Sequence, residues 1–506
     1  MKYLFNEDRR SLKERICEIN NVTEEELDVS RFNNVKDIDV LKEFKDKLDQ
    51  CRDMRFLIVG DYDCDGICAT TIIKRLLDSL EIQNNHFIPS RSRQGYGLND
   101  EIVRNAYDNG FKAIFCVDNG VSARDQLAKA RDLGIKTFVI DHHEYSDRPE
   151  CDAFLHPDMF EENYRDMCAA GLCTLLSESY RHDDLSVVYG GLATMADMVC
   201  VLGYNRYLIT EMMKILKSTD ILPVRYLLGK KEVDYDSLTY NVIPKINAVS
   251  RLEQMLNVNY VVRYLLNNDD SCLQYLGKIE EINRTRKDLG SEMYGLAQRL
   301  ADRKRDIVIV KSDVFREGLC GMIANRLMNE LEKPVIILSE NGDELKGSGR
   351  SPNGSNFYEY LKNAEEIFST FGGHAQAVGL SLKKDRLPEL LDYVENNEFS
   401  FPEQIRNVLV LDREDISFGM LEELEDLKPF GSGFMEPLFA VKDIDCRNRY
   451  IINRKYPKYR ISNQLEAISF RSSDIDKDFD TIIGRIKKDD YHAGKLSMII
   501  EDLMRF

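Results

Sequence analysis

Three aspartates occupy alternate positions in the stretch VGDYDCDG, residues 59–66: Asp61, Asp63 and Asp65. The apolar run FLIV leads into them, and a glycine directly follows the last one. Carboxylates this close repel one another, and some resist ionisation unless something neutralises them. Solvent, a lysine partner or a metal ion could do so, and the metal ion is the alternative with chemical consequences.

Similar groups follow other short apolar runs. IFCV precedes Asp118-Asn119-Gly120, FVI precedes Asp141-His142-His143, and Asp197 lies in a predicted helix within GGLATMADMV. Carboxylates with imidazole suit Mn²⁺ or Mg²⁺ better than a thiolate-rich zinc set. Two such cations about 4 Å apart, sharing one bridging carboxylate, would activate water for attack on phosphorus.

Each of these motifs also has a simpler interpretation. An aspartate after a strand is most often a helix N-cap or a turn residue, so Asp61 could cap the next helix and Asp118-Asn119-Gly120 could be a turn. Paired histidines are common on surfaces and in cores. Taken singly, the simpler interpretation is preferred. Their joint occurrence at consecutive strand ends favours a common site.

The elements that must position these groups are short strands alternating with helices. RFLIVG, KAIFCV and IKTFVI each end at one of the aspartates, and helix-like stretches such as ATTIIKRLLDSL separate them. This alternation predicts βαβ units and a parallel sheet. Ligands bind beyond the carboxyl ends of such strands, so the carboxylates should meet at one edge.

Outside this βαβ region, four other segments have different patterns. Residues 1–50 are predicted to be a helical N-terminal segment, and 201–304 a helical connector. In the connector, Leu289, Met293, Leu296 and Leu300 have the spacing of a long helix. Strands return in 305–400 as a second, smaller α/β unit. Several short strands in 401–506 predict an OB-like β-barrel.

Composition narrows the class of protein. The net charge of −18 argues against a general nucleic-acid coat protein, but allows a local basic channel and bound cations. Twelve cysteines without a CxxC pair suggest reduced, buried thiols. No apolar stretch has membrane-spanning length, and residues 1–14 do not resemble a signal peptide, so we expect a cytoplasmic protein with no membrane partner.

One segment of the predicted barrel is basic. From Lys442 to Arg460 there are seven Lys or Arg against two aspartates, with Tyr450, Tyr456 and Tyr459 interleaved. Basic groups follow a nucleic-acid backbone and aromatic rings stack on bases, so this segment could bind a single strand. A solvated hairpin face is an equally good interpretation of these residues alone.

The ordered set GDYDCDG, VDNG, DHH and ATMAD resembles the four motifs of the DHH phosphoesterases. The resemblance extends over residues 50–500 to the RecJ exonucleases, through IPSRSRQGYGLN (88–99), IPKINAVSRLE (243–253), KGSGRS (346–351), FGGHAQAVGLSL (371–382) and LKPFGSGFMEPLF (427–439). It implies that 51–200 is the DHH catalytic domain, 305–400 the DHH-associated domain with its Gly-Gly-His loop, and 401–506 the OB-like domain.

The resemblance also implies residue roles. Asp63 and Asp65 would each bind one of two divalent cations, Mn²⁺ or Mg²⁺, Asp118 would bridge them, and His142 and Asp197 would complete the ligands. Asp61, Asp141 and His143 would act as catalytic or orienting groups. Substrate would be held by Arg91, Arg251, Ser348, Arg350, Gly372, Gly373 and His374. The simpler reading of KGSGRS as a loop and GGH as a tight turn remains open.

The function implied is a 5′-to-3′ exonuclease on single-stranded DNA that releases 5′-mononucleotides. A single-strand-binding protein or a helicase would be further partners. The alternatives are a DHH phosphodiesterase on short oligonucleotides or cyclic dinucleotides, and a non-catalytic binding scaffold. The sequence departs from the family at Val314-Phe315-Arg316-Glu317-Gly318, where Trp-His is usual before the glycine, and at His156, where asparagine is usual.

Overall fold

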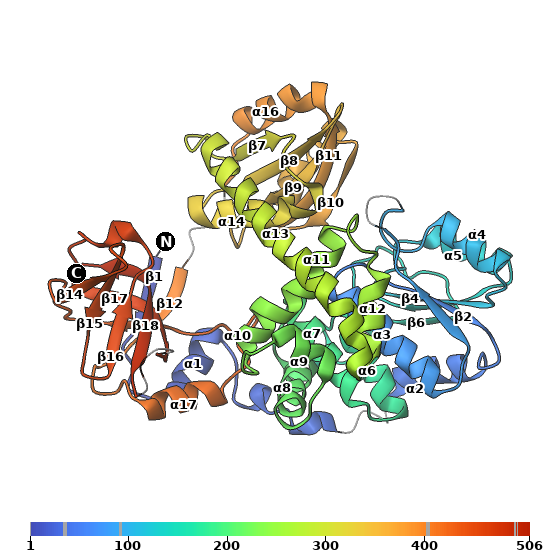
Figure 1. The fold of residues 1–506 in the computed structure, drawn as a ribbon, viewed down its shortest axis with the longest axis horizontal. Helices are drawn as coiled ribbons and strands as arrows, with labels where there is room; N and C mark the ends of the chain where they lie inside the picture. Colours follow the sequence, from blue (N-terminus) through green and yellow to red (C-terminus); the bar gives the residue numbers. More distant parts are fainter. Residues whose placement is uncertain are drawn as a thin grey trace.

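The computed structural model describes residues 2–33, 38–90, 94–400, 405–489, 492 and 494–505. These residues form a five-stranded parallel sheet, a five-stranded mixed sheet and an eight-stranded sheet. The sheets lie in three separate bodies, and a long helix runs between the first two (Figure 1). The mixed α/β class with a terminal barrel, predicted from the sequence, is confirmed.

The first body is a parallel sheet with strand order β3-β2-β4-β5-β6. Alternate residues of its strands enter two different cores. Phe56 and Ile58 pack in the layer with α3 and α6, while Leu57 and Val59 pack in the layer with α4 and α5. Its strands are β2 (Phe56–Val59), β3 (Asn84–Phe87), β4 (Ala113–Val117), β5 (Lys136–Ile140) and β6 (Ala153–Leu155), and its helices are α3 (Cys64–Ser79), α4 (Asp100–Asp108), α5 (Arg124–Asp132), α6 (Ala169–Tyr180) and α7 (Asp184–Ala196).

Helices connect this body to the second one. The long helix predicted from the leucine and methionine spacing is α13 (Leu273–Leu300), which runs from the connector to the second α/β body (Figure 1). Met293 and Ala297 of α13 are buried against that body, whereas Ile279 and Ile282 belong to the main core. The other connector helices are α8 (Gly203–Ser218), α9 (Leu222–Leu228), α10 (Tyr235–Ser237), α11 (Ile243–Arg251) and α12 (Asn259–Leu266).

The second body has strand order β10-β11-β9-β8-β7, parallel only between β7 and β8. Helix α14 packs on β8 and β9 and begins beside the end of α11. The strands are β7 (Val308–Ser312), β8 (Val335–Asn341), β9 (Glu344–Arg350), β10 (Thr370–His374) and β11 (Ala377–Lys383), and the helices are α14 (Glu317–Leu331), α15 (Phe357–Lys362) and α16 (Leu387–Asn396).

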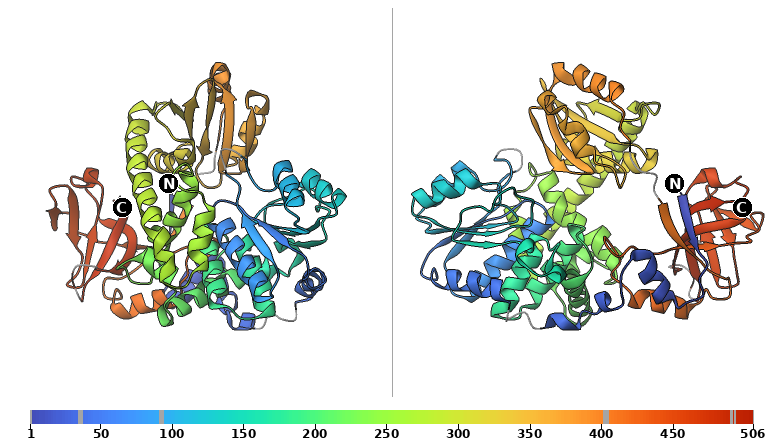
Figure 2. Two further views of the ribbon diagram at one scale, coloured as in Figure 1. Left: turned by 45° about the vertical axis from the view of Figure 1, so that its right-hand side comes forward. Right: turned by 180° about the vertical axis from the view of Figure 1, so that it is seen from behind.

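The third body contains the eight-stranded sheet, which includes the N-terminal strand β1 (Lys2–Asn6) and has the order β1-β12-β13-β17-β18-β16-β15-β14. This sheet lies beside α1 (Leu12–Asn20), and α17 (Phe418–Asp426) contacts α1 (Figure 2). Helix α2 (Asp39–Asp49) packs against the parallel-sheet body instead. The strands after β1 are β12 (Ile405–Val410), β13 (Leu438–Val441), β14 (Arg449–Ile452), β15 (Tyr456–Arg460), β16 (Leu465–Ile468), β17 (Thr481–Lys488) and β18 (Leu496–Met504).

The N-terminus corrects the prediction that residues 1–50 are a helical segment. Residues Lys2–Asn6 form strand β1, which pairs in parallel with β12, placing Leu4 opposite Asn407. Tyr3 and Phe5 pack against the barrel core. The partner strand lies about 400 residues away along the chain, so the local pattern carried no sign of this pairing.

The basic segment of the barrel is also different from the surface patch that its composition suggested. Tyr459 is fully buried and Lys458 is only 5% exposed. The Lys458 ammonium lies 2.8 Å from a Glu466 carboxylate oxygen and 3.5 Å from one of Asp489. Part of the predicted strand-binding surface is therefore a core ion network, and Tyr450 at 43% exposure remains on the surface.

In the part of the chain that the structure describes, no helix has both the length and the apolar character needed to span a membrane.

Arg206 of α8 connects the main core to the approach of the barrel. Its guanidinium is buried and donates to the backbone carbonyls of Leu27, Leu427 and Pro429. Arg206→Ala should leave these buried acceptors unsatisfied and lower the free energy of unfolding by about 2–4 kcal/mol. Denaturant unfolding measures this loss. Arg225→Ala, which removes a partly exposed arginine from α9, should cost under about 1 kcal/mol. Equal losses for both variants would contradict the account.

Candidate metal centre and substrate cleft

The carboxylates meet at one edge of the parallel sheet. Val59 lies opposite Cys116, and Val117 opposite Ile140, so the residues after these strands emerge together. Pairing continues past the strand ends, because the Asp118 N–H donates to the Ile140 carbonyl at 2.9 Å. Asp61, Asp118 and Asp141 are each less than 5% exposed. The predicted gathering of acidic groups at this edge is present in the structure.

The alternate spacing of the three aspartates follows from the turn between β2 and α3. Asp63 is the N-cap of α3, and its Oδ1 accepts N–H groups of Asp65 (2.9 Å) and Gly66 (3.1 Å). A Cβ at Gly66 would come within 2.6 Å of the Asp61 backbone, so only glycine fits there. The N-cap of α3 is therefore Asp63 and not Asp61, for which capping was the simpler interpretation, and the turn brings Asp61 and Asp65 to the same site.

Asp65 is held by the start of another helix. Its two carboxylate oxygens accept the N–H groups of Ala169 and Ala170, both at 2.8 Å, at the N-terminus of α6. The helix dipole stabilises a negative charge at this position. Each carboxylate oxygen has a second lone pair that a cation can use.

Three overlapping residue sets could hold metal ions. Within each set the potential ligand atoms lie within 4.8 Å of one another. Asp118 and His142 belong to two sets each, and of these two residues the carboxylate of Asp118 has two oxygens with which it can bind two cations. Asp61 belongs to a ligand set, although the sequence assigned it a catalytic role. The sets are Asp61, Asp63 and Asp118; Asp65, His142 and Asp197; and Asp118, His142 and His143.

The donors fit divalent cations that prefer oxygen and imidazole ligands. Oδ1 of Asp118 is buried and accepts no hydrogen bond from any residue the structure describes. It lies 3.3 Å from Nε2 of His142. A buried carboxylate oxygen of this kind calls for a positive partner, and the carboxylate and imidazole set suits Mn²⁺ or Mg²⁺.

Without cations, burial and mutual repulsion disfavour the ionised form of the clustered carboxylates. Burial, followed by the charges of Asp65 and Asp63, raises the pKa of Asp118 well above its usual range. The same causes raise the pKa of Asp197 to about 8. Burial lowers the pKa of His142, which favours the neutral imidazole that binds a metal. Cations would therefore displace protons from the carboxylates.

Asp141 has a different position from the ligands. Its Oδ2 accepts the Val121 N–H, and its Oδ1 accepts the N–H groups of His142 and His143 as well as lying 2.8 Å from Nδ1 of His143. Burial lowers the pKa of His143, but the hydrogen bond and charge of Asp141 outweigh it and raise the pKa to about 8. The contacts suit Asp141 to orienting the two histidines.

Two residues of the site were not assigned roles from the sequence. The Tyr96 hydroxyl donates to the Asp118 carbonyl at 2.7 Å and lies 3.2 Å from Nδ1 of His143. Asn119 donates to the carbonyls of Val59 and Val117 and joins the two strand ends. Their motifs, GYGL and VDNG, were recognised, but side-chain contacts between segments leave no mark in either stretch.

The predicted substrate residues separate into two groups. A niche of about 170 Å³ opens beside Asp63 and is lined by Arg251, Ser348 and Arg350, among others. A Cβ at Gly321 would come 3.0 Å from the Arg350 guanidinium, so glycine makes room for that group. Tyr62, Asn247, Ser250, Glu317, Gly318 and Gly321 complete this lining, which we call the phosphate niche.

Gly372, Gly373 and His374 do not line the phosphate niche. They form the end of edge strand β10, paired with β11, and His374 lies opposite Ala377. Gly373 has a φ of +143°, but all three residues belong to the strand and the turn is formed by Ala375 and Gln376, so the interpretation of GGH as a tight turn is wrong. Arg91 lies outside the described residues.

Comparisons with known proteins agree with this arrangement. Residues 55–201 match the DHH family N-terminal domain, 283–397 the DHHA1 domain and 409–502 the RecJ OB domain. The chain is similar to the single-stranded-DNA-specific exonuclease RecJ of Bacillus subtilis, with 27% identity over 86% of this chain, and of Escherichia coli, with 29% identity over 76%. It spans 59% and 74% of the lengths of these two curated relatives.

A solved structure shares the fold over the whole chain. The crystal structure of RecJ in complex with Mn²⁺ from Thermus thermophilus superposes with a TM-score of 0.85 at 21% identity, covering 100% of this chain and 79% of that one. At this identity the likeness establishes the architecture of the three bodies.

The raised carboxyl pKa values predict pH-dependent cation binding. The pKa of Asp197 is about 8 in the folded protein and 3.8 in its ordinary state. Because the folded state holds this proton more tightly than the unfolded state, the folded state becomes less stable as the pH rises from about 3.8 to about 8. The cation-free protein should therefore lose stability over this range, and Mn²⁺ should restore it. Mn²⁺ should raise the melting temperature more at pH 8 than at pH 6, with affinity rising roughly tenfold per pH unit as a proton is displaced. An affinity independent of pH would contradict this.

Asp118 has a left-handed backbone conformation, with a φ of +59°. This conformation costs free energy in a residue other than glycine, and the hydrogen bond from the Tyr96 hydroxyl should help to hold it. Tyr96→Phe removes the hydrogen bond to the Asp118 carbonyl and should weaken Mn²⁺ binding by roughly 5–20-fold, equivalent to about 1–2 kcal/mol. Calorimetric Mn²⁺ titration measures this. Tyr107→Phe on the surface of α4 is the matched control, and equal affinities in both variants would rule out the role.

Proposed function

The chain is a RecJ-type member of the DHH family, and from this premise we propose that it is a metal-dependent 5′-to-3′ exonuclease that degrades single-stranded DNA to 5′-mononucleotides. The observation that carries the proposal is that the phosphate niche lies directly beside the three overlapping cation-ligand sets. The side chain of Asp63 lines the phosphate niche and also belongs to one of the ligand sets. A terminal phosphate bound in the niche would bring the next phosphate of the strand, the one that is hydrolysed, to the metal centre.

Two divalent cations, Mn²⁺ or Mg²⁺, would lower the pKa of bound water and neutralise charge on phosphate oxygens. Asp61 and Asp63 would hold one cation, Asp65, His142 and Asp197 the other, and Asp118 would lie between them. This assignment moves Asp61 into the ligand set and keeps every other predicted ligand. The α6 N-terminus and the α3 cap hold these carboxylates in place before substrate arrives.

His143 would act on the substrate and Asp141 would orient it. Before cations bind, the hydrogen bond and charge of Asp141 raise the pKa of this imidazole to about 8, so that it carries a proton at neutral pH. The Asp141 contact at Nδ1 fixes the ring, so Nε2 is the atom that would donate to a phosphoryl oxygen. The charge then stabilises the negative charge that develops on phosphate.

The second α/β body would grip the strand. Ser348, Arg350 and Arg251 in the niche suit a terminal phosphate, because arginine can donate two parallel hydrogen bonds to it. Strand β10 lies on the side of that body nearest the parallel-sheet domain (Figure 1). Gly372, Gly373 and His374 would therefore contact the strand backbone outside the niche, and we assign Arg91 the same role on the strength of the family motif alone.

The remaining parts would control access. The chain divides into a DHH domain at 51–200, a connector at 201–304, a DHH-associated domain at 305–400 and an OB-like domain at 401–506 joined by β1. The OB-like domain would guide the single strand, and a single-strand-binding protein or a helicase would supply it. The twelve reduced cysteines fit the reducing cytoplasm, where we place the protein.

The proposal is tested with a 5′-phosphorylated, 3′-labelled single-stranded oligonucleotide and Mn²⁺. The wild-type protein should give a ladder that shortens from the 5′ end, while a duplex of the same sequence stays intact. Asp118→Asn should reduce the rate by roughly three orders of magnitude, because it removes the shared carboxylate. Asp125→Asn on the exposed face of α5 is the control and should retain activity.

Two outcomes would contradict the proposal. Cleavage of dinucleotides or cyclic dinucleotides with the long strand intact would assign the protein to the small-substrate phosphodiesterases. Binding of the strand without any hydrolysis would make the chain a binding scaffold.

A further inference from the structure

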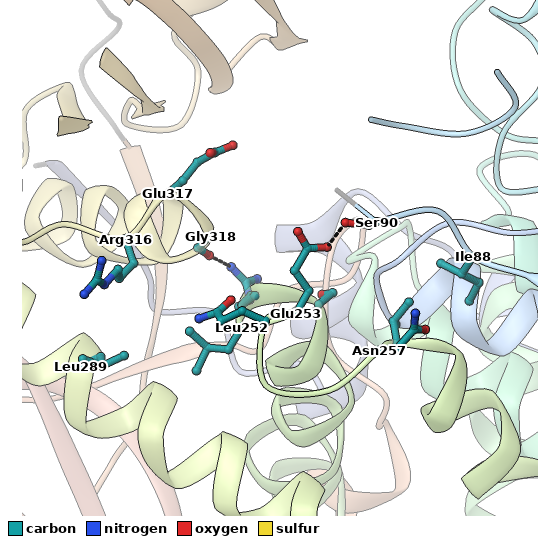
Figure 3. A pocket seen from close by; sticks show the side chains of 13 residues that line it. Ile88, Ser90, Leu252, Glu253, Asn257, Leu289, Arg316, Glu317 and Gly318 are labelled. Carbon is teal, nitrogen blue, oxygen red and sulfur yellow. Dashed lines mark hydrogen bonds between the residues drawn. The ribbon is translucent and has the colours of Figure 1, made fainter. Parts of the chain in front are cut away.

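The chain departs from its family at residues 314–318 and at His156. Arg316 and Glu317, in the first of these places, border a cavity of about 770 Å³ next to the phosphate niche (Figure 3). His156 lines neither that cavity nor the niche, and it contacts the turn that carries the two histidines of the metal centre. His156 is only 8% exposed, so its polar atoms need partners within the protein.

The imidazole of His156 has a partner at each nitrogen. Its Nε2 lies 3.2 Å from the carbonyl oxygen of His143, which can only accept, so Nε2 carries a proton and donates the hydrogen bond. Its Nδ1 lies 2.8 Å from a carboxylate oxygen of Asp158 and 3.3 Å from the backbone nitrogen of the same residue. Nδ1 therefore has a partner in either protonation state, and the ring keeps one orientation.

Aromatic contacts fix the plane of the His156 ring. Phe154 lies nearly parallel to it, with an interplanar angle of 8°, and Tyr145 lies edge-on to it, with the ring centroids 4.9 Å apart. The Tyr145 hydroxyl also donates to the Asp158 carboxylate. Two polar contacts thus join residues 143–145 to residues 156–158. We call the side chains of Tyr145, His156 and Asp158 the histidine clamp.

The histidine clamp holds the turn on the side that Asp141 does not contact. Asp141 accepts the N–H groups of His142 and His143, whereas His156 donates to the His143 carbonyl. The peptide groups on both sides of the His143 Cα are therefore fixed, and the imidazole extends from this Cα. Because a displacement of about 1 Å at a reacting group can cost about 100-fold in rate, the orientation of this backbone matters.

We propose that His156 is a positioning residue, which acts through the His143 carbonyl to hold the His143 imidazole against the phosphate that is hydrolysed. The role of His143 in this statement rests on the proposed function. His156 belongs to none of the three ligand sets, so its effect passes through the turn. Asparagine, which is usual at this position in the family, has a single side-chain nitrogen, whereas the two nitrogens of imidazole serve His143 and Asp158 separately. The clamp is therefore a property of this sequence.

Steady-state degradation of the 5′-phosphorylated strand in Mn²⁺ tests this role. His156→Phe keeps an aromatic ring beside Phe154 and Tyr145 and removes both polar contacts. It should lower kcat by roughly 10–100-fold, with KM changed less than about twofold because the phosphate niche is intact. His156→Gln, whose amide can replace Nε2 as the donor, should restore kcat to within about threefold of the wild type. His182→Phe, at an exposed histidine between α6 and α7, is the control and should change neither constant.

A double-mutant cycle separates action through His143 from a general loss of structure. In a His143→Ala protein, His156→Phe should lower the remaining rate by less than about twofold, because the side chain that it positions is gone. The full loss in both backgrounds would overturn the proposal, as would a wild-type kcat in His156→Phe alone. A kcat as low in His156→Gln as in His156→Phe would also overturn it, since the donor to the His143 carbonyl would then be irrelevant.

Hydrogen–deuterium exchange measures the clamp without turnover. The His143 amide is bonded to Asp141, so it exchanges when the turn opens. His156→Phe should speed exchange in the peptide of residues 141–146 about tenfold and leave α4 unchanged, and His156→Gln should exchange like the wild type. This local acceleration, in a protein whose wild type degrades no strand, would retain the clamp and reject the nuclease. Strand degradation with exchange and kcat unchanged in His156→Phe would reject the clamp and retain the nuclease.

Discussion

Repulsion among buried carboxylates is the constraint on which the rest of this molecule depends. Four aspartates, Asp61, Asp65, Asp118 and Asp141, are almost completely buried within one small region. The cost of burying them appears as the raised pKa of Asp118 and Asp197. Such a cluster is stable only where positive charge arrives from outside, so the site is built to hold cations.

The fold reduces this cost before any cation binds. The α3 N-terminus accepts Asp63 as its cap, and the α6 N-terminus donates two N–H groups to Asp65. Asp141 is satisfied by backbone amides and by His143. Asp118, the carboxylate shared between ligand sets, keeps a buried oxygen without a hydrogen bond from the described residues. The unsatisfied atom thus lies where two cations would share a ligand.

Much of this site could be predicted from the sequence, because its geometry is local to strand ends. An aspartate directly after each buried strand had to emerge at one edge, and the long helix α13 followed from its apolar spacing. Contacts between distant segments could not be predicted. Strand β1 pairs with β12 across the chain, Lys458 finds Glu466 in the barrel core, and Tyr96 reaches the Asp118 carbonyl. None of these leaves a periodic signal in either segment.

The account is tested most directly by electron paramagnetic resonance during a Mn²⁺ titration. Two ions that share Asp118 must lie close enough for their spins to couple. The account predicts two Mn²⁺ per chain, an exchange-coupled signal at saturation, and loss of that coupling in Asp118→Asn. One ion per chain, or two ions with the signal of isolated Mn²⁺, would contradict the claim that the aspartates are clustered to hold a pair of cations.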